Sequence, residues 1–513
     1  MLGNVAKIFA GQKTDHPLAD AKELRRVISE LPLDNAFKAL DEIDSWFESL
    51  LAENDFPDDL RFEVTRQLEE AGQQHVRKLS RDYLHSPRLS KSEEKRFWSI
   101  IHGFWLLAAA NYERSLAHAA HKDKVAEQLN SVLPMLLSRL LSALAAVVKW
   151  DQFRYGPLQT ELWLRMGHAY LAAVNAKVAD KAIKLYPNSV ATTSPSREYL
   201  RVLVFHASAM DSLLPSEIDL AERLINHFLP QFVFGPQSHP ESVCWIDAAL
   251  PMPPMRMAVI PGTITSTLRF FHCGPAHASA LALLNGLERG DELPADLHLG
   301  GQFPVKMVLP VLRHLVANWS QVPPQRQHKR HRVKHRMAVL PGLVNAFVAF
   351  SGEFGERPAG LPIESWVVED VSQGGFGAQV PDIRADWLKV GALIALQPEG
   401  GDNWLLGIVR RYQRANETEA HTGIEALARE VVAVEVRPRA ASSYAAVSGV
   451  PSLWLRDGGE PGETRLVMPP ATFDVRESME FQHAGQRYLL TPVALLEHTM
   501  EYEIARYRML TAD

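Results

Sequence analysis

Two short groups of polar residues in the last third of the chain have the types and spacing needed to bind an anionic ligand. Arg332 and Arg336 are separated by three residues, and further along the chain reads Asp370-x-Ser372-x-x-Gly375. A planar guanidinium pairs bidentately with phosphate or with the O6/N7 edge of guanine. A carboxylate accepts hydrogen bonds from N–H groups, and a hydroxyl donates or accepts. Together these residues can bind a phosphate group and the edge of a base.

Glycines complete the second group. Gly374 and Gly375 permit a tight turn after Ser372, because glycine has no Cβ and tolerates backbone angles that other residues avoid. They also let the backbone approach a ligand closely. We therefore place both glycines with Asp370 and Ser372 in the predicted binding set.

The register of the arginine pair has two solutions. Arg326 and Arg330 show the same spacing as Arg332 and Arg336. We assign the ligand contacts to Arg332 and Arg336, because Arg336 directly precedes the apolar run that begins at Met337. Arg330 takes an auxiliary role in this assignment.

Several histidines lie near these arginines. Their spacing is not that of a metal knuckle or of a helical ligand pair, so we expect them to add partial positive charge and expect no metal site. The histidines concerned are His314, His328, His331 and His335.

We predict that the part of the chain before the arginine groups is helical, because residues 1–320 show apolar positions spaced three and four apart almost throughout. Ser90 and Glu93 form a capping-box pattern, and Ser194-Pro195 is a typical helix start. Trp163 and Tyr170 resemble part of a tetratricopeptide repeat, although no repeat period recurs. We predict an all-α domain of helical hairpins, with proline-rich residues 248–262 as a loop.

The periodicity changes to two after Gln321–Gln325, where prolines end the last predicted helix. We predict a small antiparallel six-stranded β-barrel over residues 321–440, and a β-rich extension or second small sheet over residues 441–513. The fold class is therefore multidomain α + β. The strands expected in the barrel include a first strand with alternating Val344–Phe350, then Ser365–Glu369, Phe376–Val380, Leu393–Gln397, Trp404–Tyr412 and Ile424–Val436.

Composition limits the class of protein. The 513 residues, with 46% hydrophobic and 22% charged content, are typical of a multidomain globular protein. The net charge of -6 makes any anion site local. Two distant cysteines and an N-terminus without a secretory pattern favour the cytoplasm. Leu133–Trp150 is apolar but contains Arg139 and Lys149, so we expect a buried helix and no membrane span.

In order and spacing, residues 325–437 resemble a PilZ domain, the bacterial receptor for cyclic di-GMP. The resemblance rests on the arginine and Asp-x-Ser-x-x-Gly groups, on Gly391-Ala-Leu-Ile, and on Trp404-Leu-Leu-Gly407-Ile-Val-Arg410-Arg411 with Gly423-Ile-Glu. It implies that the dinucleotide binds Arg332, Arg336, Asp370, Ser372 and Gly375, with Arg330 and Gly374 beside them. Arg410 and Arg411 are interpreted as strand decoration.

Motifs of enzymes that make or break this dinucleotide are absent from the sequence. The tripeptide Glu425-Ala426-Leu427 spells one of them, but lies in a predicted barrel strand without the surrounding metal-binding acids. We expect a non-catalytic cytoplasmic effector with no cofactor. Ligand binding would change the domain arrangement and the interaction of the helical domain with a protein partner, in motility, pili or biofilm signalling.

Two other functions stay open at this point. The chain can be a helical adaptor whose barrel binds nothing. It can also be a single-stranded nucleic-acid binder that stacks bases on exposed strand aromatics such as Trp366 and Trp404. The acidic residues Glu369 and Asp370 beside Trp366 argue against a nucleic-acid partner.

Overall fold

The computed structural model describes residues 14–86, 89–157, 159–299, 301, 303–322, 328–352, 362–383, 387–401, 403–439, 449–457 and 459–512. The chain divides into two compact units. One comprises Met1–Arg154, Leu158–Met210 and Pro215–Pro324, and the other comprises Tyr155–Pro157, Asp211–Leu214 and Gln325–Asp513. Each unit has its own hydrophobic core, which is described separately below.

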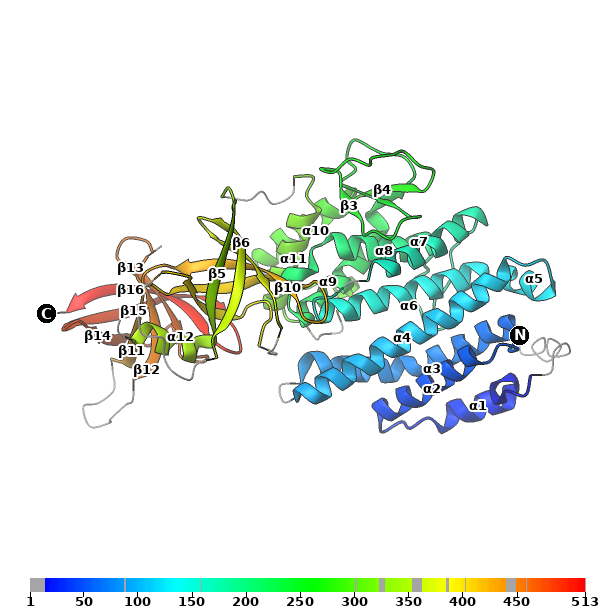
Figure 1. Ribbon diagram of the computed structural model, residues 1–513, viewed down its shortest axis with the longest axis horizontal. Coiled ribbons are helices and arrows are strands. Elements are labelled where there is room, and N and C mark those ends of the chain that lie inside the picture. The colour runs from blue at the N-terminus through cyan, green and yellow to red at the C-terminus, as the bar shows by residue number, and fades with distance from the viewer. Residues whose placement is uncertain are drawn as a thin grey trace. The chain divides into compact units, whose positions relative to one another are not determined.

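The first unit, called here the helical unit, is a stack of amphipathic helices, and α2, α3, α4 and α6 lie side by side in it (Figure 1). The helices are α1 (Ala21–Glu30), α2 (Ala36–Ala52), α3 (Asp58–His85), α4 (Lys91–Ala119), α5 (Lys124–Ser131), α6 (Leu133–Phe153), α7 (Thr160–Asn175), α8 (Pro195–Ala207), α9 (Pro215–Phe228), α10 (Pro275–Glu288) and α11 (Val305–Trp319). The predicted helical domain is confirmed.

Local sequence signals set the helix starts. Ser90 caps α4 in a reciprocal capping box with Glu93, as predicted. The Ser194 side chain accepts from the backbone N–H of Arg197 at the start of α8, with Pro195 in the first turn. These interactions involve only neighbouring residues, which is why the sequence reveals them.

Helix α6 is the apolar segment considered above for membrane contact. Within the described residues it is the one helix long and apolar enough to cross a membrane, and 78% of its apolar window is buried inside the protein. Its buried Arg139 bonds to Glu69 and Glu70 of α3. In the structure α6 packs as a core helix of the helical unit.

A small antiparallel sheet adds to the predicted all-α domain. Its strands, in the order β1-β4-β2-β3, are β1 (Val233–Gly235), β2 (Cys244–Asp247), β3 (Met255–Arg256) and β4 (Leu268–His272). All residues of β2 are buried, so this strand lacks the alternating pattern of a half-exposed strand. The proline-rich residues 248–262 were predicted to form a loop. They are irregular except for the two-residue strand β3.

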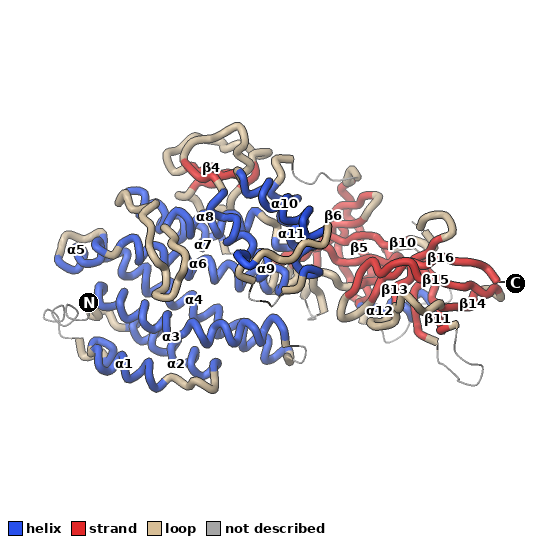
Figure 2. Tube along the Cα trace, turned by 180° about the vertical axis from the view of Figure 1, so that it is seen from behind, coloured by secondary structure: helices blue, strands red, loops and turns tan. Residues whose placement is uncertain are grey.

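The second unit, called here the barrel unit, contains two closed six-stranded antiparallel barrels (Figure 2). The predicted barrel is confirmed, and the predicted C-terminal β-rich segment is a second barrel. The first barrel, in spatial order β10-β7-β6-β5-β8-β9, is built of β5 (His331–Pro341), β6 (Glu364–Ser372), β7 (Gly375–Val380), β8 (Leu393–Pro398), β9 (Leu405–Arg414) and β10 (Ala420–Ala428). The second, in order β11-β12-β13-β16-β15-β14, is built of β11 (Val431–Pro438), β12 (Val450–Leu455), β13 (Glu463–Met468), β14 (Met479–His483), β15 (Gln486–His498) and β16 (Glu503–Ala512).

The segment from Gly342 to Ser351 is a helix, α12, and not the strand that was predicted there. Leu343, Ala346 and Ala349 are buried on one side of it, at helical spacing, and Val344 is exposed. The apparent two-residue alternation is a property of a short apolar run that fits both periods. The first strand of the barrel is therefore the arginine-bearing segment that precedes α12.

An apolar seam joins the two barrels within the barrel unit. Helix α12 packs with Leu393 and Leu406 of the first barrel and with Leu453 and Ile504 of the second in one buried cluster. The predicted strand Ile424–Val436 is two strands, β10 and β11, which belong to different barrels. The chain passes from one barrel to the other between Ala428 and Val431.

Candidate functional site

The candidate site lies on neighbouring strands of the first barrel. Strand β5 pairs antiparallel with β6, with Arg332 directly opposite Asp370. Ser372 ends β6, and Gly375 begins β7 opposite it. The structure thus brings Arg332 next to Asp370, whereas Arg336 lies opposite Val367, nearer the start of β6.

Arg332 and Arg336 both lie within β5, which begins before the apolar run at Met337. The β5–β6 register shifts between Arg332 and His335, where β5 has an extra residue. Such a β-bulge lets the strand continue while its direction and twist change. Arg332 and Arg336 are both exposed, and Arg336 Nη1 donates to Ser365 Oγ at 3.3 Å.

Arg330 makes the closest link between the two groups. Its Nη1 donates to both carboxylate oxygens of Asp370, at 2.8 and 3.0 Å. The two side chains keep 31% and 27% of their surface exposed, so the ion pair remains accessible to solvent. Arg330, which was given an auxiliary role, therefore contacts the predicted carboxylate directly. Its partner in the alternative register, Arg326, lies outside the described residues.

Two glycines of β7 allow neighbouring strands to approach closely at the site. A Cβ on Gly375 would lie 2.0 Å from the carbonyl oxygen of Ile424 on β10, so this position requires glycine for close strand pairing. A Cβ on Gly377 would lie 2.7 Å from Asp370 Oδ1. The hydroxyl of Ser372 donates to the carbonyl of Gly375 at 3.2 Å and closes the β6–β7 turn.

Gly377 was missed by the motif, although it could have been found from the sequence. It follows Gly375 by two residues, and side chains at that spacing lie on the same face of a strand. Of the two, Gly377 lies directly opposite Asp370 on β6 and makes room for its carboxylate, whereas Gly375 makes room for the backbone of Ile424 on β10.

A recess of about 520 Å³, within the size range of small-molecule sites, is lined by residues next in sequence to Arg330 and Asp370, which do not line it themselves. Its lining joins one ammonium and three imidazoles to the end of β6. The lining residues are His328, Lys329, His331, Val333, His335, Val371, Ser372 and Gln373. Of the predicted binding residues only Ser372 lines this recess, and Arg332 and Arg336 do not. Lys329 gives it one formal positive charge, and the imidazoles can donate hydrogen bonds to an anion.

A second recess, of about 610 Å³, lies on the second barrel. Its charged lining residues carry both signs: Arg439, Asp474, Arg476 and Glu477. Mixed signs largely cancel the field that would attract an anion. The smaller recess, which Lys329 and Ser372 line, is the better site for a phosphate-containing ligand.

Two further arginines of the barrel are engaged elsewhere. Arg410 is hydrogen-bonded to Glu425 and Glu497 at 2.6 to 2.9 Å. Burial lowers the pKa of Arg410, but these hydrogen bonds raise it above its ordinary value. Arg411 lies 3.4 Å from Asp211, also within the barrel unit. Both arginines form ion pairs with neighbouring carboxylates, in agreement with their interpretation as strand residues outside the binding site.

The aromatic residues considered for base stacking are not presented on the surface. Trp366 is 1% exposed in the core of the first barrel and stacks on Trp387 with a ring separation of 5.8 Å. Both indole N–H groups donate to Glu364. Trp404 packs against the apolar seam between the barrels. These rings stabilise the fold and do not form an exposed stacking platform.

The fold and the site define a class of protein in which a helical unit is followed by paired β-barrels, with a cationic recess on the first barrel. Residues 22–238 match the family model described as the N-terminal domain of the cyclic-di-GMP receptor FimW. The match covers less than half of the chain, lies within the helical half and ends before β2. No curated protein matches the chain.

Proposed function

We propose that this chain is a non-catalytic receptor that binds cyclic di-GMP on its first, PilZ-type barrel. The observation that carries the proposal is the hydrogen bond between Arg330, just before β5, and Asp370 on the neighbouring strand β6, two residues before Ser372, which lines a recess together with Lys329. The similarity of the helical half to the N-terminal domain of a cyclic-di-GMP receptor supports the choice of this ligand.

The chemistry of the ligand fits these groups. Cyclic di-GMP carries two phosphodiester anions and two guanines. A guanidinium binds a phosphate or the O6/N7 edge of guanine, and the Asp370 carboxylate can accept from guanine N1–H and N2–H2. Lys329 and the imidazoles of the recess add positive charge for the phosphates. Binding requires the Arg330–Asp370 ion pair to exchange its internal partners for those of the ligand.

The role of Arg332 and Arg336 follows from their exposure. Both lie on the strand that carries one side of the site, and both side chains are exposed to solvent. We propose that they close over the ligand phosphates once Arg330 has turned from Asp370. In the alternative register, Arg326 and Arg330 replace Arg332 and Arg336, and Arg330 makes a principal contact with the ligand. Single alanine substitutions of these arginines, assayed by ligand affinity, distinguish the two registers.

The helical unit is proposed to transmit the signal in the cytoplasm to a protein partner. The long segment of the barrel unit begins at Gln325, so Arg330 follows the division between the units closely in sequence. Ligand binding at Arg330 can therefore favour one arrangement of the units over another, to the extent that the ligand prefers that arrangement. Small-angle scattering with and without the dinucleotide tests this coupling.

The test of the proposed function is a calorimetric titration of the full chain with cyclic di-GMP. Wild type should bind, and cyclic di-AMP should bind far more weakly because it lacks the guanine N1–H and O6. Asp370→Ala and Arg330→Ala should both weaken binding. Arg437→Ala is the matched control, since Arg437 is an exposed strand arginine of the second barrel. Absence of heat with wild type, or equal loss in the control, refutes the proposal.

The non-catalytic character has its own measurement. The dinucleotide recovered after incubation with the protein should be chemically unchanged by chromatography. Appearance of a linear dinucleotide or of mononucleotides would overturn it. If wild type neither binds nor converts the dinucleotide, the remaining candidate is a helical adaptor with a non-binding barrel.

A further inference from the structure

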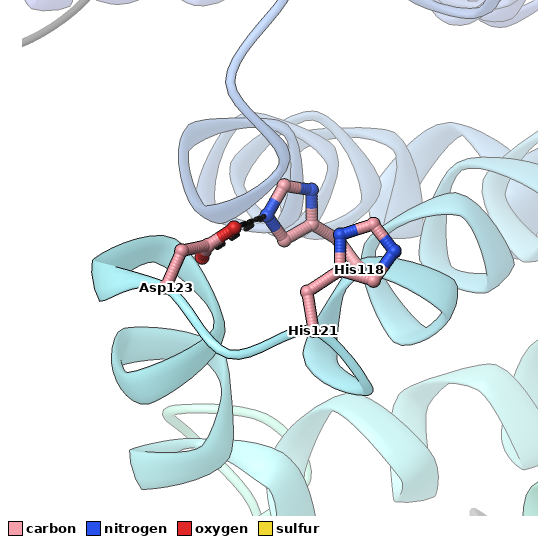
Figure 3. A group of neighbouring side chains, drawn as sticks. All are labelled: His118, His121 and Asp123. Carbon is pink, nitrogen blue, oxygen red and sulfur yellow. Dashed lines mark hydrogen bonds and ion pairs between the residues drawn. The ribbon is translucent and has the colours of Figure 1, made fainter.

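A cluster of two histidines and one aspartate lies in the helical unit and shares no residue with the proposed dinucleotide site. His118 is in the last turn of α4, and His121 and Asp123 are in the short connection to α5 (Figure 3). One ligand atom from each of the three side chains lies within 4.8 Å of the others. The rings of His118 and His121 face each other with centroids 4.6 Å apart. Two imidazoles and a carboxylate form a donor set that Zn²⁺ prefers.

His118 lies between two carboxylates. Its Nδ1 is 2.9 Å from Asp58 Oδ2, and its Nε2 is 3.0 and 3.2 Å from the two oxygens of Asp123. A neutral imidazole has one N–H and can donate to only one of these carboxylates. The other ring nitrogen then presents a lone pair to an anion. A proton or a metal ion bound at that nitrogen removes this conflict, and the Zn²⁺ titration below distinguishes the two.

Asp58 is held in place to orient His118. Its Oδ1 accepts from Arg61 Nε at 2.8 Å, while Oδ2 faces His118. Arg61 is fully buried, and its remaining N–H groups donate to the backbone carbonyls of Leu50, Glu53 and Phe56. A carboxylate that accepts the second N–H of a histidine is the usual support of a metal-binding imidazole. This support fixes Nδ1 as the donor and directs Nε2 toward Asp123.

Distances within the cluster fit a metal of zinc's size. Two ligands at about 2.0 to 2.1 Å from a tetrahedral centre lie about 3.3 Å apart. The observed separations between His118 Nε2 and Asp123 are 3.0 and 3.2 Å. Asp123 Oδ1 accepts from the backbone N–H of Ala126 as the N-cap of α5.

The described residues contain a second cluster of possible metal ligands, which differs from the first in the hydrogen bonds of its histidine rings. It contains His239, Glu241 and His272. Nδ1 of His239 accepts from the backbone N–H of Glu241, and Nδ1 of His272 accepts from that of Gly274, both at 3.2 Å. Hydrogen bonds within the protein therefore account for the orientation of both rings. No unsatisfied lone pair faces a carboxylate in this second cluster.

We propose that His118 Nε2, His121 and Asp123 bind one Zn²⁺ ion, with the fourth coordination position open to solvent. The ion would join the end of α4 to the start of α5 and stabilise that corner of the helical unit. Asp58 is a positioning residue that acts through His118. The site is independent of the barrel, and its occupancy does not require the dinucleotide.

The experiment uses the full chain without an affinity tag, freed of metal by a chelator. Zn²⁺ binding is measured by calorimetry, and Co²⁺ provides a spectroscopic probe through its visible absorption bands. Wild type should bind one equivalent with micromolar or tighter affinity and unfold at a higher temperature with Zn²⁺. His121→Ala should weaken binding at least tenfold, and it should fold normally because His121 is exposed. Asp58→Asn should weaken binding about 10- to 100-fold.

The matched control is His168→Ala, since His168 is an exposed helical histidine of the same unit outside the cluster. It should leave both affinity and stoichiometry unchanged. The proposal is overturned if wild type binds no Zn²⁺ beyond the His121→Ala level, or if His168→Ala weakens binding as much as His121→Ala. Binding retained within threefold in His121→Ala also overturns it.

Discussion

Replacing Asp370 by alanine separates the ligand-binding role of the Arg330–Asp370 pair from its contribution to folding. The pair is roughly a third exposed on each side, and ion pairs of this kind stabilise proteins by about 0.2 to 1 kcal/mol. Asp370→Ala should therefore lower the free energy of unfolding by about 1 kcal/mol at most. Urea denaturation of the full chain measures this loss.

The expected effect on binding is larger. In the proposed complex Asp370 accepts from guanine, and a hydrogen bond to a charged group contributes about 1.5 to 3 kcal/mol. Two such bonds contribute about 3 to 6 kcal/mol, and the ion pair broken on binding subtracts at most about 1 kcal/mol, so the net loss in Asp370→Ala is at least about 2 kcal/mol. This corresponds to a Kd for cyclic di-GMP that is higher by about 30-fold or more. Calorimetric titrations of wild type and variant under the same salt conditions measure it.

Arg330→Ala and the double variant complete the thermodynamic cycle. In the free protein the coupling between the two residues should be about 1 kcal/mol at most, because it is that of an exposed pair. Each single variant should nevertheless lose most of the ligand affinity. If Asp370→Ala folds like wild type and its Kd rises less than threefold, Asp370 does not contact the ligand and the reasoning fails. A loss caused by Arg332→Ala but not by Arg330→Ala would restore the register first assigned from the sequence.

Three further predictions concern the site, the helical core and pH. Gly377→Ala should weaken dinucleotide binding about as much as Asp370→Ala in the same titration, because its Cβ would lie within 3 Å of the Asp370 carboxylate; unchanged affinity would contradict this. Arg139→Leu should lower the free energy of unfolding in urea by about 3 to 5 kcal/mol, since it leaves the buried Glu69 without its cation; a loss below 1 kcal/mol would contradict this. Burial lowers the pKa of His206 to about 4, so the unfolded chain binds a proton between pH 6.5 and 4 that the folded chain excludes. Stability should then fall as the pH falls through this window, by up to about 1.4 kcal/mol per pH unit, and His206→Gln should lack this component in pH-dependent urea melts.

The helices were predictable because their signals are local. The Ser90–Glu93 box and the Ser194 cap involve residues three apart, and the structure shows both sets of hydrogen bonds. The α12 helix was mispredicted for the opposite reason. Its sequence fits two periods, and the choice is made by packing against both barrels, which the local sequence does not encode.

The division between the barrels was also not readable from local sequence. No glycine or proline separates β10 from β11. The chain turns there because the carboxylate of Asp457 accepts from the backbone N–H groups of Arg429 and Glu430. Asp457 follows them by almost thirty residues, after β12. Because the stabilising residue is so distant in sequence, the residues of the turn carry no recognisable turn signal.

Part of the candidate site was likewise predictable from local sequence, and part was not. The spacing of Asp370, Ser372 and Gly375 indicates a turn between strands, and the structure places that turn between β6 and β7. The choice between arginine pairs depends on where β5 begins and on its bulge, which arise from pairing with β6. Sequence spacing alone gave Arg330 the lesser role.

The His118 cluster shows how a sequence pattern acquires meaning from a distant residue. His118-x-x-His121-x-Asp123 crosses the end of one helix and the start of the next, a spacing that reads equally well as a polar connection. The structure adds Asp58, sixty residues earlier in the chain, at hydrogen-bond distance from the other nitrogen of His118. With a carboxylate on each side, the ring cannot satisfy both as a neutral donor. A proton or a metal ion at Nε2 is therefore favoured by the two carboxylates, of which the local sequence shows only Asp123.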